Sequence, residues 1–323
     1  TVGASWDFDV LSTPCATTKS RACTNPVAHA WSGSGWGHVL MADNAAPTFF
    51  SGTGKALVPV GSTYDWAYSV VQQASGKLVL AGSSSVSSYN DFSLTRLNTD
   101  GSLDTSFGTA GKLLVPVGSY YDYGYSMVQQ ADGKLVVAGS SATGGPSYRF
   151  SLIRIDADGS LDTSFGAGGK LFMGVEGSGT SVIQQADGKL IVAGYSDNGG
   201  NTDFTLIRLN ATDGSLDSSF GSGGTLLIPV GSGTDQAYSV IQQTDGKLVM
   251  AGRSHNGTNY DFSLIRLNAT DGSLDTSFNG TGKFIMPVGG SDDQSYSVIQ
   301  QTDGKLVMAG YSKNGTNTDF SLI

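Results

Sequence analysis

The feature that most constrains the fold is an eleven-residue stretch that the chain repeats. QQTDGKLVMAG occurs at residues 242–252 and again, without a change, at residues 300–310. Three related copies precede these two: QQASGKLVLAG from Gln72, QQADGKLVVAG from Gln129 and QQADGKLIVAG from Gln184. Successive copies begin 57, 55, 58 and 58 residues apart. Units of this size are too small to bury a core alone, so the period predicts a propeller or a solenoid.

Each unit contains four short segments with the composition of β-strands. In the fourth unit they are GGTLLIPVG (223–231), AYSVIQQ (237–243), KLVMAG (247–252) and DFSLIRLN (261–268). Asp245-Gly246 separates two of them, and Asp-Gly favours the tight turn of a hairpin. The unbroken apolar run Leu248–Met250 is typical of a strand that is covered on both faces. We therefore predict an all-β propeller with four-stranded blades and five clear repeats.

Two residue types recur at fixed places in the repeat. Prolines end the first segment of four units, at Pro59, Pro116, Pro229 and Pro287. Because proline cannot donate to a strand ladder, this end should lie at a sheet edge or a bulge. Phenylalanines precede the first segment of every unit, at Phe50, Phe107, Phe165, Phe220 and Phe278. We expect these rings to fill the gaps between neighbouring blades.

The composition excludes several classes of protein. Charged residues make up only 14% of the chain, Glu176 is the single glutamate, and glycine occurs 46 times, which argues against helices. The net charge is −9 and there is no basic run, so nucleic acid is not an expected partner. No apolar run has transmembrane length. Low charge with abundant Ser, Thr and Gly favours an extracellular or cell-surface protein.

Residues 1–48 differ from the repeats in residues 49–323. WDFDVL (6–11) resembles DFSLIRL and GHVLMAD (37–43) resembles GKLVMAG, so this region is predicted to be a cap or a degenerate sixth blade. A strand from it could close the ring or pair with a neighbouring subunit. The region also holds Cys15 and Cys23, whose proximity predicts a disulfide, with two free thiols as the alternative.

Taken together, the pattern LDTSFGxxGK…QxDGKLVVAG…FSLIRLNxDGSLDTSFG resembles the bacterial delta-60 repeat. The resemblance extends from about residue 50 to residue 323. It implies a secreted or surface-attached β-propeller whose function is mostly unassigned. The family has no established catalytic residues, so the resemblance implies none in this chain.

A candidate ligand site lies just before the second strand of four units. Its members pair an aspartate with a tyrosine three residues later: Asp65 and Tyr68, Asp122 and Tyr125, Asp235 and Tyr238, Asp293 and Tyr296. Rings stack on sugar faces while carboxylates accept hydroxyl hydrogens, which suits a glycan. The alternative is that the aspartate caps a turn and the tyrosine packs between blades. The polar loops that follow the third strand, such as residues 83–90 and 141–148, are a second candidate, although drift explains their variation equally well.

Metal binding and catalysis have weaker support. Residues 156–162, DADGSLD, partly resemble a calcium loop, but an Asx-capped turn is the simpler explanation, so we predict no metal and no cofactor, with calcium as the alternative. The chain is nearly symmetric, whereas catalysis normally needs one asymmetric constellation, and we predict no enzymatic activity. The expected function is recognition or adhesion, with a glycan or a cell-surface protein as partner. The alternative is a structural subunit of an extracellular filament or surface layer.

Overall fold

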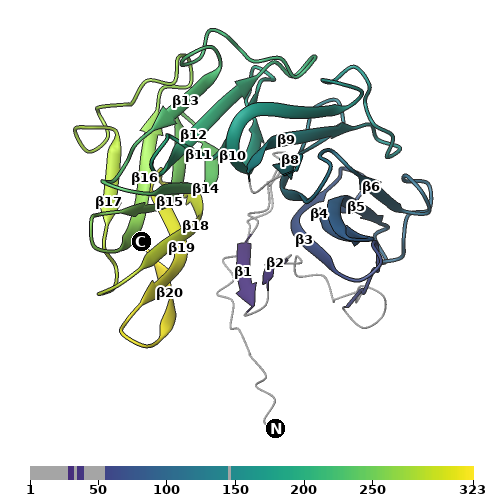
Figure 1. Ribbon diagram of the computed structural model, residues 1–323, viewed down its shortest axis with the longest axis horizontal. Helices are drawn as coiled ribbons and strands as arrows, with labels where there is room; N and C mark the ends of the chain where they lie inside the picture. Colours follow the sequence, from purple (N-terminus) through teal and green to yellow (C-terminus); the bar gives the residue numbers. More distant parts are fainter. Residues whose placement is uncertain (1–27, 33–34, 40–54, 145–146) are drawn as a thin grey trace, which may run out of the picture.

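The computed structural model describes residues 28–32, 35–39, 55–144 and 147–323 (Figure 1). Every element in these ranges is a β-strand. None of the described residues forms a helix of the length and apolarity needed to cross a membrane. Cys15, Cys23, Phe50 and residues 6–11 lie outside the described residues, so the disulfide stays a prediction.

Five antiparallel blades follow one another along the chain. Blade 1 contains β3 (Asp65–Gln72), β4 (Leu78–Val86), β5 (Tyr89–Leu97) and β6 (Lys112–Val115). Blade 2 contains β7 (Asp122–Gln129), β8 (Leu135–Ala142), β9 (Tyr148–Ile155) and the first part of β10 (Lys170–Gln184). Blade 3 contains the second part of β10, β11 (Leu190–Asp197), β12 (Thr202–Leu209) and β13 (Thr225–Ile228). Blade 4 contains β14 (Asp235–Gln242), β15 (Leu248–His255), β16 (Tyr260–Leu267) and β17 (Lys283–Met286). Blade 5 contains β18 (Asp293–Gln300), β19 (Leu306–Lys313) and β20 (Thr318–Leu322).

The blades are offset by one strand from the repeat units that the sequence suggested. The segment predicted to open the fourth unit, β13, pairs with β12 of the preceding blade, Phe204 lying opposite Ile228. In blades 1, 2, 4 and 5 the strand that opens the blade is instead the one that begins with the repeated aspartate, and in blade 3 it is the second part of β10. These first strands contact one another from blade to blade and form the inner ring of the propeller, while the proline-ended strands are the outer edges.

One strand departs from this plan, because β10 serves two blades. Its first part pairs with β9 as the outer strand of blade 2, and its second part pairs with β11 as the inner strand of blade 3. Gly174 stands where Pro116 and Pro229 end the outer strands of the other blades. Without the proline the strand need not stop, since each residue can still donate to a ladder.

Each junction between blades contains a phenylalanine beneath an arginine. Phe107, Phe165 and Phe220 are fully buried, which confirms that these rings fill the gaps. In blade 3 the Arg208 guanidinium lies 4.3 Å from the centre of the Phe220 ring and is ion-paired with Asp217 at 2.7 Å. The same guanidinium donates 3.0 Å to the carbonyl oxygen of Thr270 in blade 4. The repeated arginine therefore ties each blade to the next one.

The blades form an arc that runs from β3 to β20 (Figure 1). A hairpin of β1 (Ala28–Ser32) and β2 (Gly35–Val39) precedes them, and β2 lies against β3. The prediction of a cap or an incomplete blade within residues 1–48 stays a prediction, since most of that region lies outside the described residues.

Candidate functional site

The four repeated aspartates are turn caps. Asp122, at the start of β7, accepts hydrogen bonds from the backbone N–H groups of Val117 (2.7 Å) and Gly118 (2.9 Å). Asp235 and Asp293 do the same for their own blades, and all three are fully buried. Asp65 makes the same contacts but is exposed.

The predicted ligand role is therefore corrected for Asp122, Asp235 and Asp293, whereas for the exposed Asp65 it stays a prediction. The oxygens of Asp122, Asp235 and Asp293 face backbone amides of the connection that leads into each blade, and no surface of these side chains is left for a sugar. Burial raises the pKa of Asp122 and of Asp235, although the amide hydrogen bonds oppose the shift. The turn-cap interpretation was the alternative left open by the sequence, and it holds for the described aspartates.

The four tyrosines each occupy a β-bulge. The ladder between the first two strands of a blade slips by one residue there, for example between Ala237 and Ser239, and Tyr238 is the extra residue. A bulge redirects its side chain, and here it brings rings from neighbouring blades together. Tyr68 lies 5.4 Å from Tyr125, and Tyr238 lies 5.3 Å from Tyr296, between ring centres.

Blade 3 has Thr180 at the bulge instead of a tyrosine. Its hydroxyl donates to the carbonyl oxygens of Ala193 (3.1 Å) and Ala237 (2.8 Å). A different residue supplies the ring: Tyr195 of β11 lies 6.3 Å from Tyr238. The sequence reasoning missed Tyr195, although its position after Ala-Gly, where two other copies have serine, was a signal.

Blades 1 and 2 carry an extended cluster of rings, which we call the tyrosine array. Its six members are Tyr89, Tyr120, Tyr121, Tyr123, Tyr125 and Tyr148. Ring centres are 5.3 Å apart for Tyr89 and Tyr121, 6.3 Å for Tyr121 and Tyr123, and 6.0 Å for Tyr123 and Tyr125. The array therefore runs without a break from the inner ring of strands toward the loops.

The outer members of the tyrosine array are open to solvent. Tyr89, Tyr120 and Tyr121 are 37%, 40% and 38% exposed. Tyr89 and Tyr148 come from the loops that the sequence marked as a second candidate, so the structure joins the two candidate regions in one surface. Burial raises the pKa of Tyr125 and of Tyr148, so their hydroxyls stay neutral donors at physiological pH.

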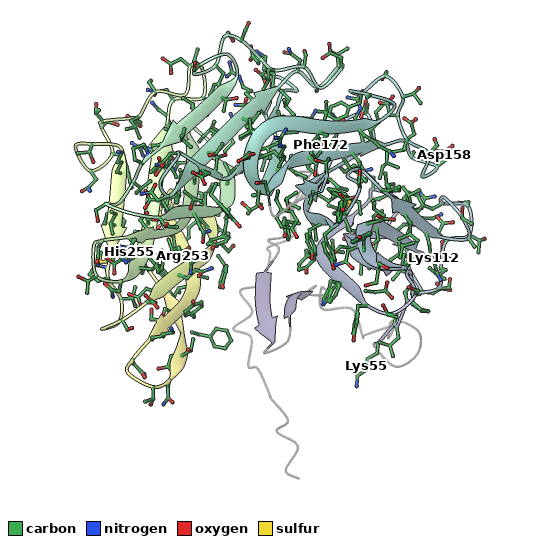
Figure 2. All side chains as sticks on the ribbon, in the orientation of Figure 1. Lys55, Lys112, Asp158, Phe172, Arg253 and His255 are labelled. Atoms are coloured by element: carbon green, nitrogen blue, oxygen red, sulfur yellow. The ribbon has the colours of Figure 1, made fainter. Side chains whose placement is uncertain are left out.

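Blade 4 has a cation at the corresponding place. Arg253 of β15 donates to the side-chain oxygen of Gln236 (2.6 Å) and to that of Gln294 (2.8 Å) in blade 5. Its guanidinium carbon lies 4.2 Å from the centre of the Tyr260 ring, and Figure 2 shows Arg253 beside His255. Within the described residues, no carboxylate lies within 4.0 Å of its nitrogens. The Tyr238 hydroxyl completes this Arg253 network by donating 2.8 Å to Gln236.

The suspected calcium loop is used for other contacts. Asp158 accepts hydrogen bonds from the backbone N–H and the hydroxyl of Ser160, at 2.8 and 2.6 Å. Asp162 is ion-paired with Arg154 at 2.6 Å, and Asp156 with Lys134 at 2.6 Å. In the part of the chain that the structure describes, no three His, Cys, Asp or Glu side chains are grouped to hold a metal ion.

Several solved structures have a backbone fold similar to that of this chain. An endo-arabinase from Bacteroides thetaiotaomicron is 10% identical over 83% of this chain and 96% of its own, with a TM-score of 0.45. A mannose phosphorylase from Leishmania mexicana is 13% identical over 82% and 86%, with a TM-score of 0.40. An α-L-arabinofuranosidase from Clostridium thermocellum is 14% identical over 76% and 82%, with a TM-score of 0.37.

These comparisons contradict the prediction that the chain has no enzymatic activity, because the similar chains are described as enzymes. The prediction of no enzymatic activity is therefore withdrawn. At such low identities and TM-scores, the likeness assigns no reaction and no substrate to this chain.

The repeats themselves match a known family. No protein with a curated description matches the chain. Four segments match the family described as "Domain of unknown function (DUF5122) beta-propeller", at residues 73–107, 130–165, 185–220 and 243–278. Each segment begins at the second glutamine of the repeat and ends at the phenylalanine that fills a blade junction. The predicted resemblance is confirmed to this extent: these four segments match a model of β-propeller repeats whose function is unassigned.

Proposed function

We propose that the protein is an extracellular recognition module that binds a glycan through the tyrosine array of blades 1 and 2. The observation that carries this proposal is the unbroken contact from the exposed Tyr89 through Tyr121 and Tyr123 to the half-buried Tyr125. The Tyr89 ring meets Tyr121 edge to face, and the Tyr121, Tyr123 and Tyr125 rings are stacked. Rings that support one another in this way lose little conformational entropy when a ligand stacks on them.

The chemistry of the array suits a sugar. The rings offer apolar faces to the C–H groups of a pyranose, and their hydroxyls donate and accept hydrogen bonds at the rim. The array consists of tyrosines alone and carries no charge, which suits a neutral glycan better than a charged one. Tyr89, Tyr120 and Tyr121 are exposed side by side, and grouped exposed apolar surface is typical of a binding site.

The first test is a screen of immobilised glycans, followed by titration of each hit against Tyr89→Ala and Tyr121→Ala. We expect each truncation to weaken binding by about tenfold or more, because stacking on one ring contributes about 1.4 kcal/mol or more. The matched controls Tyr89→Phe and Tyr121→Phe keep the ring and should bind nearly as well as the wild type.

Binding that is indifferent to all four substitutions would remove the tyrosine array as the site. A chain that binds no glycan in the screen would overturn the proposal. Analysis of new reducing ends after incubation with each bound glycan separates recognition from turnover.

A second candidate function, assembly into a filament or layer, has its own structural support. Residues Lys55–Val58 repeat the sequence of the outer strands, as in Lys112–Val115, yet they form no strand. Leu57 is 98% exposed. At the other end of the arc, Phe320 of β20 is 81% exposed, whereas its equivalent Phe92 is fully buried.

The two exposed segments are complementary in register. In blade 1, Phe92 pairs with Val115, so pairing of Lys55–Val58 with β20 would place Val58 opposite Phe320. We expect a second copy to supply this strand by addition to the edge of blade 5. Electron microscopy and size-exclusion chromatography of this chain should show head-to-tail assemblies that Leu57→Lys disperses into folded monomers. Monomers at every concentration of the wild type would exclude this candidate.

A further inference from the structure

Arg253 differs from the other arginines that the structure describes, because it has no carboxylate partner among the described residues. Its side chain is only partly exposed, yet no carboxylate oxygen there lies within 4.0 Å of its nitrogens. A charge that is partly removed from water and lacks a counter-ion is costly, so an anion that reaches it is bound favourably. The arginines that are ion-paired with an acid of their own blade are Arg96, Arg149, Arg154, Arg208 and Arg266.

The surroundings of Arg253 depart from the repeat at three positions together. The residue that follows Ala-Gly in the second strand is a serine in blades 1 and 2, a tyrosine in blades 3 and 5, and Arg253 in blade 4. Its partner across the ladder is aromatic in blades 1 and 2 but glutamine in blades 4 and 5, at Gln236 and Gln294. The arginine and the two glutamines therefore form a unit that the other three blades lack.

The two glutamines hold the guanidinium in place without neutralising it. Arg253 donates through Nε and Nη2 to the side-chain oxygen of Gln236, at 3.0 and 2.6 Å, and through Nη1 to that of Gln294, at 2.8 Å. These bonds use three of its five N–H groups and leave one on each terminal nitrogen. Two N–H groups on one rigid plane match the two oxygens of a carboxylate.

The charged groups beside Arg253 cancel each other. The ammonium of Lys313 lies 3.3 Å from the carboxylate of Asp292. The backbone N–H of Tyr260 and the cations of Lys313 and Arg253 hold the pKa of Asp292 below its ordinary value, so this carboxylate stays charged and continues to balance the lysine. The positive charge of Arg253 is left without a counter-charge, which suits a ligand that carries one negative charge.

The buried carboxylates of blade 4 do not supply the missing counter-charge. Asp235 and Asp261 both pair across the ladder with Ser254, the residue after Arg253. Because neighbouring residues of a strand point to opposite faces, these two side chains leave the sheet on the face opposite to Arg253. Asp235 is occupied there as a turn cap, and Asp261 accepts a hydrogen bond from Asn256 at 2.7 Å.

Aromatic rings border the guanidinium. The ring centre of Tyr260 lies 4.2 Å from the guanidinium carbon, and the Tyr311 hydroxyl donates 3.4 Å to the side-chain oxygen of Gln294. Arg253, Tyr260 and Tyr311 are each partly exposed, so a ligand can approach from solvent. Aromatic rings pack against the apolar face of a sugar ring, and tyrosine hydroxyls both donate and accept at its edge.

We propose that Arg253 anchors a binding site for an acidic sugar, which is a glycan unit that carries one carboxylate. The two remaining N–H groups of the guanidinium bind the carboxylate, and the rings of Tyr260 and Tyr311 border the sugar. This site lies on blades 4 and 5 and shares no residue with the tyrosine array, so it does not rest on the proposed function.

The test titrates the whole chain with the methyl glycosides of glucuronic and galacturonic acid. A nitrogen-15 spectrum reads the Nε–H resonance of Arg253, which Arg253→Lys identifies by its loss. We expect a saturable shift with at least one uronide and none with methyl glucoside, which has the same ring without the carboxylate. Sodium acetate, sodium sulfate and N-acetylglycine represent a bare carboxylate, a sulfate and a peptide terminus. Each should bind at least about tenfold more weakly than the uronide, because it lacks the sugar ring.

Four variants locate the site by calorimetry with the same uronide. Arg253→Met removes the charge and Arg253→Lys removes the planar fork, and each should weaken binding by about tenfold or more. Gln236→Glu gives the guanidinium a carboxylate of nearly the same shape, so it should abolish binding while the chain stays folded. Arg149→Met is the matched control, because Arg149 is already paired with Glu176, and it should leave the affinity unchanged.

Several outcomes would overturn the proposal. They are no response to either uronide, equal binding of methyl glucoside, and binding that survives both Arg253→Met and Gln236→Glu. Acetate or sulfate that binds as tightly as the uronide would reduce the site to a general anion site, and tighter binding of N-acetylglycine would assign it to a peptide. Tyr121→Ala should leave uronide binding intact, so the failure of this site and the failure of the proposed function can be told apart.

Discussion

Blades 2 and 4 have the same backbone arrangement but carry different side chains on the face that holds the tyrosine array: blade 2 carries aromatic rings and blade 4 a cation. In blade 2, Tyr123 pairs across the ladder with Ser140, and in blade 4 Gln236 pairs with Arg253 at the same register. A tyrosine begins the third strand of both blades, at Tyr148 and Tyr260. The ring at Tyr148 therefore lies beside another ring, while the ring at Tyr260 lies beneath a guanidinium. Two side-chain exchanges convert an aromatic surface into a cationic one without changing the fold.

This contrast shows how nearly symmetric blades can carry different side chains on one face of the arc. The backbone of each blade is held by capped turns, β-bulges and the phenylalanines at the blade junctions. Each described blade has at least some of these three features. Specificity is left to the few positions that face outward from that backbone, and these are the positions at which the copies differ.

The largest expected effect on stability comes from removing the buried turn cap of blade 2, Asp122, which lies beside the tyrosine array. Asp122→Ala would leave the buried N–H groups of Val117 and Gly118 without their acceptor, and we expect the free energy of unfolding to fall by about 2–4 kcal/mol. The matched variant Asp65→Ala, at an exposed cap, should cost about 0.5 kcal/mol. Urea unfolding followed by circular dichroism measures both. Equal losses would mean that burial does not set the strength of the cap.

A smaller effect should follow from removing the cation of blade 4. Arg253→Met deprives Gln236 and Gln294 of their charged donor, while the Tyr238 hydroxyl still satisfies Gln236. We expect a loss of about 1 kcal/mol in the same unfolding experiment. Glycan affinity at the tyrosine array should not change, since the two faces lie on different blades. A drop in that affinity would show that the two faces act as one site.

The smallest effect concerns pH and Asp91, which lies near the start of the third strand of blade 1. Asp203 and Asp261 occupy the equivalent positions in blades 3 and 4. Those two accept from Asn198 and Asn256 at 2.7 Å, and the shorter loop of blade 1 has no such asparagine. Burial and the nearby Asp122 carboxylate raise the pKa of Asp91 to about 6. The raised pKa means that the folded state holds this proton more tightly than the unfolded chain does. Its stabilising contribution is therefore present below the unfolded pKa of about 4 and is lost as the pH rises through 6.

Calorimetry of the wild type and Asp91→Asn across this range checks the sign. The variant should match the wild type at about pH 4 and be the more stable of the two at about pH 8, since asparagine has no charge to bury. Parallel profiles would show that Asp91 is solvated in the folded state.

The strands, the tight turns and the class of fold could be predicted from the amino-acid sequence, because these depend on local properties. Alternation and apolar runs mark strands, Asp-Gly marks the hairpins, and a period near 57 residues forces the units to pack on one another. The buried Phe107 and Phe165 were predictable for the same reason, since a large ring repeated between strands must be covered by the neighbouring unit.

The start of each blade and the contacts of its polar residues became clear from the packing of the folded chain. Strand order within a sheet depends on which segments pair, so β13 could not be assigned to blade 3 from its own residues. The spacing of Asp122 and Tyr125 is the same whether the carboxylate faces a sugar or a turn, and only its burial against two amides distinguishes them. The tyrosine array joins Tyr89 and Tyr148, which are far apart in the chain, through contacts between two blades. Contacts of this kind are set by how whole blades pack, and no local pattern in the sequence encodes them.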